Sequence, residues 1–442
     1  MLPGSAGYDA ARIVWNGMID RRPALVARCE GVTDVVEAIR FGREHDLPIA
    51  VRCGGHSVGG FSTCDDGIVL DLSRMHGVKV DAERRVARVR GGSLLRELDE
   101  TVQAHGLVCP VGVVGHTGVA GLALGGGMGR LQRRLGFTVD NILGVDLVSA
   151  DGERLHVSQD EHPDLFWGIR GAGPNFGVVT AFELQLHELA PVVTAGVVVV
   201  PAERGLEAAA VVRGFLADAP DEVQVTMGFG LGADDDPPAI VGRPYAAAGM
   251  TYSGAPEGAD AALAPLLGPL RALGPVEDGL GRRRYLELQS MNDEAMAWGK
   301  RFYMKGAFLK ELTDASVAAA LATVEVAPSP GASITLWAHG GAIARVPDDA
   351  MAFTGRGAAF WIGVESEWDD PAADDEHVAW ARHAMAALEP FTGDGHYVND
   401  MVETGEDVAR RVYGPGKYDR LVELKRRYDP DNVFRLNQNV RP

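Results

Sequence analysis

The sequence predicts a two-domain protein of the α+β class. Its 442 residues exceed the length at which a single hydrophobic core usually stops growing. Residues 1–190 mix helix and strand patterns around three glycine-rich clusters, whereas the chain beyond residue 190 alternates strand-like runs with alanine-rich helical stretches. This change of pattern predicts that one domain ends and another begins near residue 190.

The composition is typical of a folded protein that binds neither membranes nor nucleic acids. Hydrophobic residues make up 46% of the chain and charged residues 23%, and no apolar run approaches the ~20 residues that a membrane span needs. The formal net charge of −19 argues against a nucleic-acid partner, because such partners bind clustered lysine and arginine. The N-terminus lacks a secretion-signal pattern, and Cys29, Cys53, Cys64 and Cys109 show no C-x-x-C or metal spacing. We therefore expect a cytoplasmic protein with reduced thiols, and the oligomeric state stays open.

The N-terminal region predicts a helix followed by several short strands. Residues 31–52 read as a helix capped by Thr33 and then a strand that runs into the glycine loop 54–60. Further strands are expected within 67–75 and 78–92, where apolar residues alternate with polar ones.

The next stretch predicts a helix, a glycine-rich segment and a hairpin. The helix opens at Ser93 and is closed by Gly106. The glycine-rich segment covers 113–136, and 139–158 holds two apolar runs joined by an Ala-Asp-Gly turn, which predicts a β-hairpin. A third glycine cluster leads into a strand at about 178–186.

Beyond residue 190 the chain predicts a sheet with covering helices. The strand-like runs are 194–201, 222–230, 333–340 and 358–368. From about residue 405 the pattern predicts one helix that ends at the Asp-Pro-Asp-Asn of residues 429–432, followed by a tail that docks on the protein.

The glycine loop allows more than one interpretation. Residues 55–59 match the G-x-S-x-G of a hydrolase elbow with Ser57 as nucleophile, and His339 with the glycines after it could imitate an oxyanion loop. In such hydrolases the oxyanion loop precedes the nucleophile, whereas His339 follows Ser57. The residues after Ser57 are also too polar and glycine-rich to begin the required helix. Alternatively, glycines let a backbone curl its N–H groups around an anionic cofactor, or they form plain turns.

Five separated motifs resemble the berberine-bridge-enzyme-like branch of the vanillyl-alcohol oxidase superfamily. They are "VRCGGHSVGG", "GIVLDLSRM", "TGVAGLALGGGMG", "PDLFWGIRGAGPNFGVVT" and "YDPDNVFRLNQNVRP", and they follow one another in the family's order. Within this branch the pattern is similar to bacterial members of the 6-hydroxy-D-nicotine oxidase type. The resemblance implies a PCMH-type FAD-binding domain over 1–190, completed by 396–442, and a substrate domain over 191–395 with a mixed or antiparallel sheet covered by helices.

In this family the histidine of the Gly-Gly-His loop carries FAD through a bond to the 8α-methyl carbon, and His56 holds that place. A neutral imidazole can form such a bond. Many members also bind the flavin through a cysteine. Val114 occupies the position of that cysteine in this chain, so we predict a single attachment. The resemblance further implies that the cofactor is bound by Arg52, Cys53, Gly54, Gly55, Ser57, Gly59, Thr117, Gly118, Gly121, Leu122, Asp140, Gly173, Asn175, Phe176, Gly177, Val178, Asn437 and Asn439. His116 either points into the site or is a polar loop residue.

Tyr397 resembles the active-site tyrosine of sugar-oxidising relatives, and the alternative is a packed surface aromatic. A tyrosine base needs its pKa of ~10 lowered by a cation, hydrogen bonds or the flavin. Thr335, Leu336 and Trp337 stand where the nicotine-oxidising relative holds charged residues, which argues against that same amine substrate.

The expected function is therefore oxidation of a small alcohol, hydroxylated ring or amine by hydride transfer to flavin N5. Dioxygen or another acceptor would then reoxidise the flavin, with hydrogen peroxide as the product when the acceptor is dioxygen. The alternatives are oxidative cyclisation or dehydrogenation of a secondary metabolite, a flavin-binding protein without turnover, and the serine hydrolase. No metal is expected.

Overall fold

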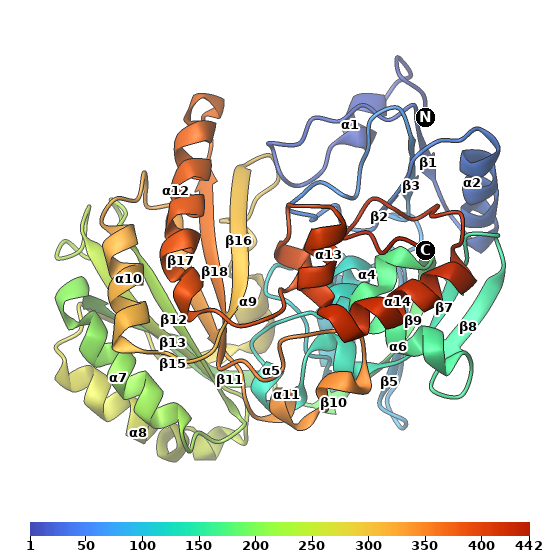
Figure 1. The fold of residues 1–442 in the computed structure, drawn as a ribbon. Helices are drawn as coiled ribbons and strands as arrows, with labels where there is room; N and C mark the ends of the chain where they lie inside the picture. The colour runs from blue at the N-terminus through green and yellow to red at the C-terminus, as the bar shows by residue number, and fades with distance from the viewer.

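The computed structural model describes residues 1–442 and places the large sheet in one half of the molecule and the two termini in the other (Figure 1). None of its helices is both long and apolar enough to cross a membrane.

A small parallel sheet opens the half that holds the termini. Its strand order is β1-β3-β2, with both neighbour pairs parallel. The helix α2 packs on it through Val35 and Ile39, which are almost fully buried. The helix begins at Val32 rather than after Thr33, because the carboxylate of Asp34 accepts the N–H groups of Glu30 and Gly31. The bounds are α1 Tyr8–Arg12, β1 Leu25–Arg28, α2 Val32–Glu44, β2 Ile49–Arg52 and β3 Ile68–Asp71.

A five-stranded antiparallel sheet, of order β4-β5-β9-β7-β8, follows in the same half. Strands β7 and β8 confirm the hairpin predicted within 139–158. Helix α3 begins at Leu95, two residues after the predicted Ser93, whose hydroxyl instead accepts the N–H of Gly77. The bounds are β4 Val78–Asp81, β5 Val86–Arg90, α3 Leu95–Gln103, β6 Leu107–Val108, α4 Val119–Gly125, α5 Gln132–Leu135, β7 Ile142–Val148, β8 Arg154–Ser158, α6 Pro163–Ala172, β9 Val178–Gln185 and β10 His187–Glu188.

The other half is an eight-stranded antiparallel sheet with helices on its outer face, as predicted (Figure 1). The path is β14-β11-β13-β12-β17-β18-β16, and β15 pairs with β11. Helices α7, α8, α10 and α12 cover it. The bounds are β11 Val192–Pro201, α7 Gly205–Leu216, β12 Val223–Leu231, β13 Pro244–Tyr252, α8 Ala259–Ala272, β14 Glu277–Asp278, β15 Gly281–Arg284, α9 Tyr285–Ser290, β16 Arg301–Leu309, α10 Asp314–Val324, β17 Ala332–Ala338, α11 Ala342–Arg345, β18 Phe360–Trp368 and α12 Asp374–Leu388.

Strand β18 has two faces with different neighbours. Ile362 and Val364 belong to the core beneath the covering helices, whereas Trp361 belongs to the core of the half that holds the termini. Because successive side chains of a strand point to opposite faces, Trp361, Gly363 and Glu365 share the inner face. The inner face of the large sheet therefore packs directly against the other half.

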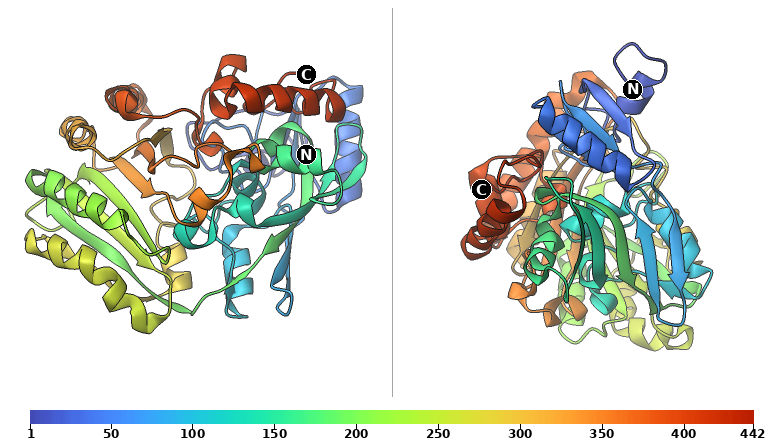
Figure 2. Two further views of the ribbon diagram at one scale, coloured as in Figure 1. Left: turned by 60° about the horizontal axis from the view of Figure 1, so that its bottom comes forward. Right: turned by 90° about the vertical axis from the view of Figure 1, so that its right-hand side faces the viewer.

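The C-terminal tail returns to the half that holds the N-terminus, as both views of Figure 2 show. It forms two helices rather than the single predicted one, α13 (Glu406–Tyr413) and α14 (Pro415–Tyr428). Gly414 adopts φ 73°, and Pro415 follows it, so the first helix ends there. Helix α14 packs on α6, and the buried Lys425 donates to the carbonyls of Asn175 and Phe434.

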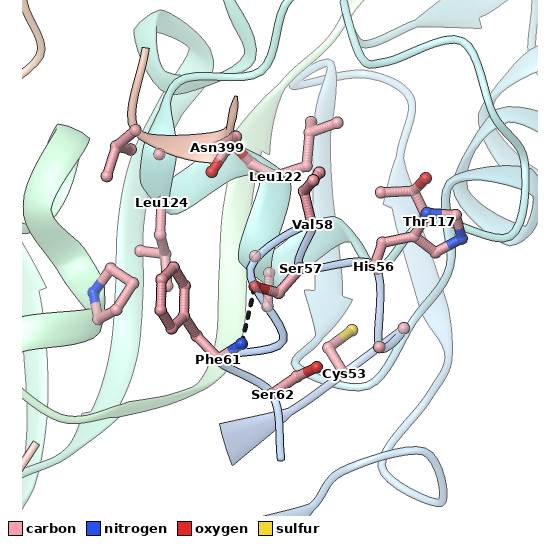
Figure 3. Close-up of a pocket in the computed structure, with 18 of the residues that line it drawn as sticks. Cys53, His56, Ser57, Val58, Phe61, Ser62, Thr117, Leu122, Leu124 and Asn399 are labelled. Atoms are coloured by element: carbon pink, nitrogen blue, oxygen red, sulfur yellow. Dashed lines mark hydrogen bonds between the residues drawn. The ribbon is translucent and has the colours of Figure 1, made fainter. Parts of the chain in front are cut away.

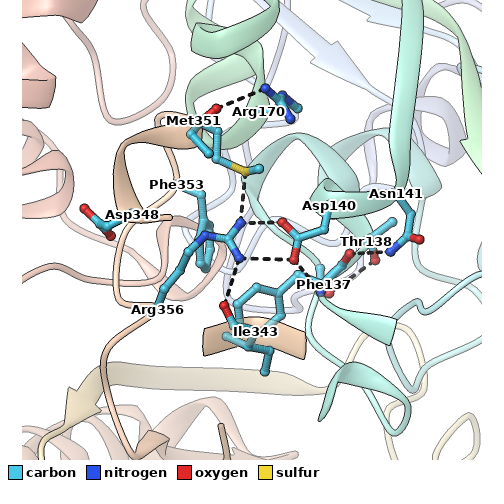
Figure 4. Close-up of polar contacts among 12 residues, drawn as sticks. Phe137, Thr138, Asp140, Asn141, Arg170, Ile343, Asp348, Met351, Phe353 and Arg356 are labelled. Atoms are coloured by element: carbon cyan, nitrogen blue, oxygen red, sulfur yellow. Dashed lines mark hydrogen bonds and ion pairs between the residues drawn. The ribbon is translucent and has the colours of Figure 1, made fainter. Parts of the chain in front are cut away.

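An ion pair joins the two halves away from the termini. Arg356, which follows α11, forms a two-pronged pair with Asp140, and its Nη2 lies 3.0 Å from the sulfur of Met351 (Figure 4). The guanidinium lies beside the rings of Phe137 and Phe353. Since Arg356 is buried, this pair fixes the segment after α11 against the other half.

Candidate functional site

A cavity of about 420 Å³ lies between the inner face of the large sheet and the half that holds the termini. One end is apolar and is formed by Ile49, Val51, Leu72, Phe434 and Leu436. The other end is formed by β16, β18 and the segment 397–401. The loop after β2 runs along its middle, and Figure 3 shows Cys53, His56 and Ser57 of this loop facing the cavity.

The glycine loop presents unused backbone donors to the cavity. The N–H groups of His56, Ser57 and Val58 donate to no acceptor in the protein. Two glycines make this arrangement possible: a Cβ on Gly54 would lie 2.3 Å from the backbone nitrogen of Gly118, so the two loops pack backbone to backbone. A run of free N–H groups in such a loop is suited to an anionic group.

The hydroxyl of Ser57 is already occupied within the loop. Its Oγ accepts the N–H of Phe61 at 2.9 Å, and this bond is drawn in Figure 3. No histidine is bonded to Ser57, and His339 lies beside Phe137 and Phe308 instead. The serine therefore has no base to activate it.

His56 is held in a neutral form at the cavity wall. Its ring stacks on Trp15, with ring centres 4.7 Å apart and planes at 17°. Its Nε2 lies 2.6 Å from Nδ1 of His116, and its Nδ1 contacts no polar group of the protein. Burial first, and His116 second, lower the pKa of His56 to about 3. The imidazole is thus neutral at neutral pH, and its Nδ1 has no hydrogen-bond partner in the protein.

Tyr397 lies at the end of the cavity away from the apolar end. Its side chain is buried, so it is not a surface aromatic. Its oxygen accepts the N–H of Gly127 at 2.9 Å and the side-chain amide of Asn399 at 2.8 Å. Burial and then Asp400 raise the pKa of Tyr397, which is the reverse of what a tyrosine base needs. With both lone pairs taken, the hydroxyl can still donate its proton to a molecule in the cavity.

Two carboxyl groups near Tyr397 were not predicted from the sequence. Glu365 points into the cavity from the inner face of β18 and forms no hydrogen bond or ion pair with the protein. Burial, and then Glu367, raise the pKa of Glu365 to about 7. Asp400 accepts the indole N–H of Trp361 at 2.5 Å, and burial raises its pKa well above the usual range. For Glu365 the available sequence signal was a pair of glutamates, Glu365 and Glu367, at the end of a largely apolar strand.

The cavity brings together fourteen of the predicted site residues: Cys53, Gly54, Gly55, His56, Ser57, Val114, Thr117, Gly118, Gly121, Leu122, Gly177, Val178, Tyr397 and Asn437. Eight others do not line it: Arg52, Gly59, His116, Asp140, Gly173, Asn175, Phe176 and Asn439. Several of these have structural partners. Arg52 pairs with Asp71 at 2.8 Å, Asp140 pairs with Arg356, and Asn175 accepts the N–H of Val440.

The apolar end of the cavity carries one unused acceptor. The side-chain nitrogen of Asn437 donates to the carbonyl of Pro174 at 2.8 Å, and its Oδ1 is buried without a partner. A ring with polar edges would satisfy this oxygen, and the apolar residues around it would pack on the ring faces. The cavity thus fits a long cofactor with a flat ring at each end and an anionic linkage between them.

Two family models match the chain. The model described as "FAD binding domain" covers residues 23–158, and the one described as "Berberine and berberine like" covers residues 396–441. Among the curated relatives, (R)-6-hydroxynicotine oxidase of Paenarthrobacter nicotinovorans is 34% identical, over 100% of this chain and 96% of its own. An FAD-linked oxidoreductase of Dictyostelium discoideum is 32% identical over 97% of this chain and 91% of its own.

Solved structures share the fold over the full chain. 6-Hydroxy-D-nicotine oxidase from Arthrobacter nicotinovorans superimposes with a TM-score of 0.87 at 31% identity, covering 100% of this chain and 97% of that one. A xylooligosaccharide oxidase from Myceliophthora thermophila gives a TM-score of 0.88 at 22% identity, covering 100% and 96%. At that identity the second likeness concerns the fold alone.

Proposed function

We propose, from the premise that this chain belongs to the berberine-bridge-enzyme-like FAD-linked oxidoreductases, that it is an oxidase holding one FAD through a single bond to His56. Its substrate would be a small alcohol, hydroxylated ring or amine that is neutral or cationic. The observation that carries the proposal is the cavity itself, which has free N–H groups and a neutral imidazole in its middle and an unpaired carboxyl at one end.

The residues of the cavity suit FAD. The N–H groups of His56, Ser57 and Val58 would bind the pyrophosphate, and the side chain of Asn437 would meet the adenine. Val114 cannot form a second bond to the flavin, since valine has no nucleophile. When bound, FAD would accept a hydride from a substrate C–H bond and pass two electrons to dioxygen, which gives hydrogen peroxide.

The protein would supply the proton transfer. Glu365 reaches the cavity without a hydrogen-bond partner and titrates near neutral pH, so it can accept a proton from a substrate hydroxyl or ammonium group. Tyr397 would orient the same substrate by donating a hydrogen bond from its hydroxyl. In this assignment Tyr397 remains a site residue but is not the base.

The charge of the cavity favours neutral and cationic substrates. Its ionisable lining residues include Glu365 and Asp400 but no lysine or arginine. A carboxylate or phosphate on the substrate would lie in a partly desolvated site without a counter-charge, which is costly. The four free thiols, Cys29, Cys53, Cys64 and Cys109, also support a reducing compartment such as the cytoplasm.

A second candidate is oxidative cyclisation or dehydrogenation of a secondary metabolite, and the largely apolar lining of the cavity favours it as well. The test is anaerobic mixing of the purified protein with matched alcohols, amines and carboxylates, followed by the loss of flavin absorbance and by peroxide release after air is admitted. Bleaching by neutral or cationic compounds with peroxide release supports the oxidase. Bleaching only by large polycyclic phenols supports the second candidate, and bleaching only by carboxylates contradicts the substrate class.

A further inference from the structure

The side-chain amide of Asn16 joins the glycine loop to β16, which is an edge strand of the large sheet. Its Nδ2 donates to the carbonyls of Val58 at 3.1 Å and Phe302 at 2.8 Å. Its Oδ1 accepts the N–H groups of Phe302 at 3.2 Å and Met18 at 3.0 Å. Because Asn16 is only 2% exposed, these four bonds lie in the interior, where the two halves of the molecule meet.

The partners of Asn16 leave its amide a single orientation. A primary amide carries two N–H donors and one oxygen with two acceptor sites. Both carbonyls can only accept and both backbone N–H groups can only donate, so a rotated amide would face like groups. An aspartate carboxylate has the same shape but no donors. The position therefore specifies an amide, and every hydrogen-bonding site of that amide is used.

Both ends of this link belong to the cavity wall. Val58 carries the last of the three free N–H groups in the loop, and its side chain is labelled in Figure 3. Phe302 also lines the cavity, and two residues further along β16 Met304 lies opposite Glu365 of β18. Asn16 therefore connects the free N–H groups of the loop to the pair of strands that carries the unpaired carboxyl.

The chain around Asn16 is also held at the start of β16 by its backbone. The N–H of Gly17 donates to the carbonyl of Lys300 at 2.8 Å, and a Cβ on Gly17 would collide with the carbonyl oxygen of Gly299. This backbone contact does not involve the amide, so it remains when the amide is removed. The amide adds the bridge from Val58 to β16, and its loss frees the end of the loop without detaching residue 16 from the sheet.

We propose that Asn16 is a positioning residue for hydride transfer, which holds the glycine loop and β16 at one separation and thereby sets how the substrate C–H bond meets the flavin. This inference rests on the proposed function. In the step, the C–H bond breaks and its hydrogen leaves with both electrons to flavin N5, while Glu365 takes the proton of the substrate hydroxyl or ammonium group. The product is a carbonyl compound or an iminium ion. A misplacement of about 1 Å can slow such a reaction about 10²-fold.

The test compares full-length Asn16→Ala with the wild type and with Asn292→Ala, which changes a half-buried asparagine whose side chain forms no hydrogen bond. In Asn16→Ala a water molecule can occupy the vacated space and bond the freed backbone groups, so we expect the fold to be retained. Anaerobic mixing with benzyl alcohol, benzylamine and the fastest-reducing compound of the screen above gives the limiting rate of flavin reduction and the half-saturating concentration. Acid precipitation gives the flavin content. Hydrogen–deuterium exchange of the peptide that contains Phe302 reports on the link itself without any substrate.

We expect the flavin of Asn16→Ala to be reduced about 10–100-fold more slowly at saturation. The half-saturating concentration and the flavin content should stay near those of the wild type, because the substrate contacts and the N–H groups of the loop remain. The peptide that contains Phe302 should exchange faster, because its N–H loses the amide acceptor. Asn292→Ala should match the wild type in all four measurements.

A wild-type limiting rate in Asn16→Ala, together with faster exchange at Phe302, would overturn the positioning role. A loss of flavin with an unchanged rate per bound flavin would also overturn it, because Asn16 would then serve cofactor binding alone. A wild-type protein without flavin, or with flavin that no compound of the screen reduces, would overturn the proposed function and this inference with it. Should Asn16→Ala fail to fold, Asn16→Ser, which keeps one donor and one acceptor, is measured in its place under the same criteria.

Discussion

The Nζ of Lys425 lies 2.7 Å from Oδ2 of Asp429, and both side chains are fully buried. Asp429 also accepts the N–H groups of Val433 and Phe434, so this pair determines how the chain turns after α14. Phe434 is part of the cavity wall. The buried pair therefore connects the stability of the tail to the shape of the apolar end of the cavity.

Lys425→Met is expected to lower the free energy of unfolding by about 3–5 kcal/mol, because it leaves the Asp429 carboxylate buried without its partner. Urea denaturation measures this change, and Lys310→Met at an exposed lysine provides the matched control. Equal stability of the two variants would contradict the coupling. The double variant Lys425→Met with Asp429→Leu removes both charges and should recover part of the loss.

His56→Ala is expected to abolish the covalent flavin but not FAD binding, since the pyrophosphate donors belong to the backbone. The absorbance spectrum of the acid pellet and of the supernatant measures both quantities. Flavin should move entirely from pellet to supernatant. A variant pellet that stays yellow would show that another residue carries the cofactor.

Glu365→Gln is expected to lower kcat by about 10²–10⁴-fold, the usual range for loss of a general base. In the wild type, kcat should rise with pH through about 7, because Glu365 must lose its proton before it can accept one from the substrate. The variant should lose this limb of the pH profile. The control is Glu311→Gln, at an exposed position on the chain. An unchanged pH profile in the Glu365 variant would assign the proton transfer to another group.

Asp99→Asn is expected to change how stability depends on pH. Asp99 is buried, only one of its oxygens has a partner, the amide of Gln289, and burial raises its pKa to about 7. The unfolded chain releases this proton near its ordinary pKa of ~3.9, so the folded state binds more protons between about pH 4 and 7. The free energy of unfolding of the wild type therefore falls as the pH rises through this window.

In the Asn variant this contribution is absent, and at pH 8 the protein should be more stable than the wild type by about 1–4 kcal/mol. Thermal denaturation between pH 4 and 8 measures the difference. Because Glu365 titrates in the same window in both proteins, only the difference between them is informative. If the stability of the wild type and of the Asn variant changed with pH in parallel, the role of Asp99 would be contradicted.

The sequence predicted the α+β class, the hairpin of β7 and β8 and the strands of the large sheet, because each depends on local patterns of apolar residues and glycines. The predicted cap of α2 was wrong: Asp34 accepts the N–H of Gly31, and the hydroxyl of Thr33 accepts a hydrogen bond from Arg154 instead. Glu365 could not be predicted, because its position in the cavity depends on β18 packing against a half of the molecule that is far away in sequence. Asp140 was expected at the cofactor but pairs with Arg356, a partner 216 positions further along the chain that no local pattern reveals.

The two faces of β18 have a consequence for how relatives of this protein can diverge. Ile362 and Val364 maintain the interior beneath the helices, while Trp361 and Glu365 face the cofactor half of the molecule. A change at Glu365 can thus alter this end of the cavity while the side chains beneath the helices stay as they are. A new substrate can therefore be accommodated by changing a few side chains on one face of the strand. One architecture can then persist while the oxidised compound changes.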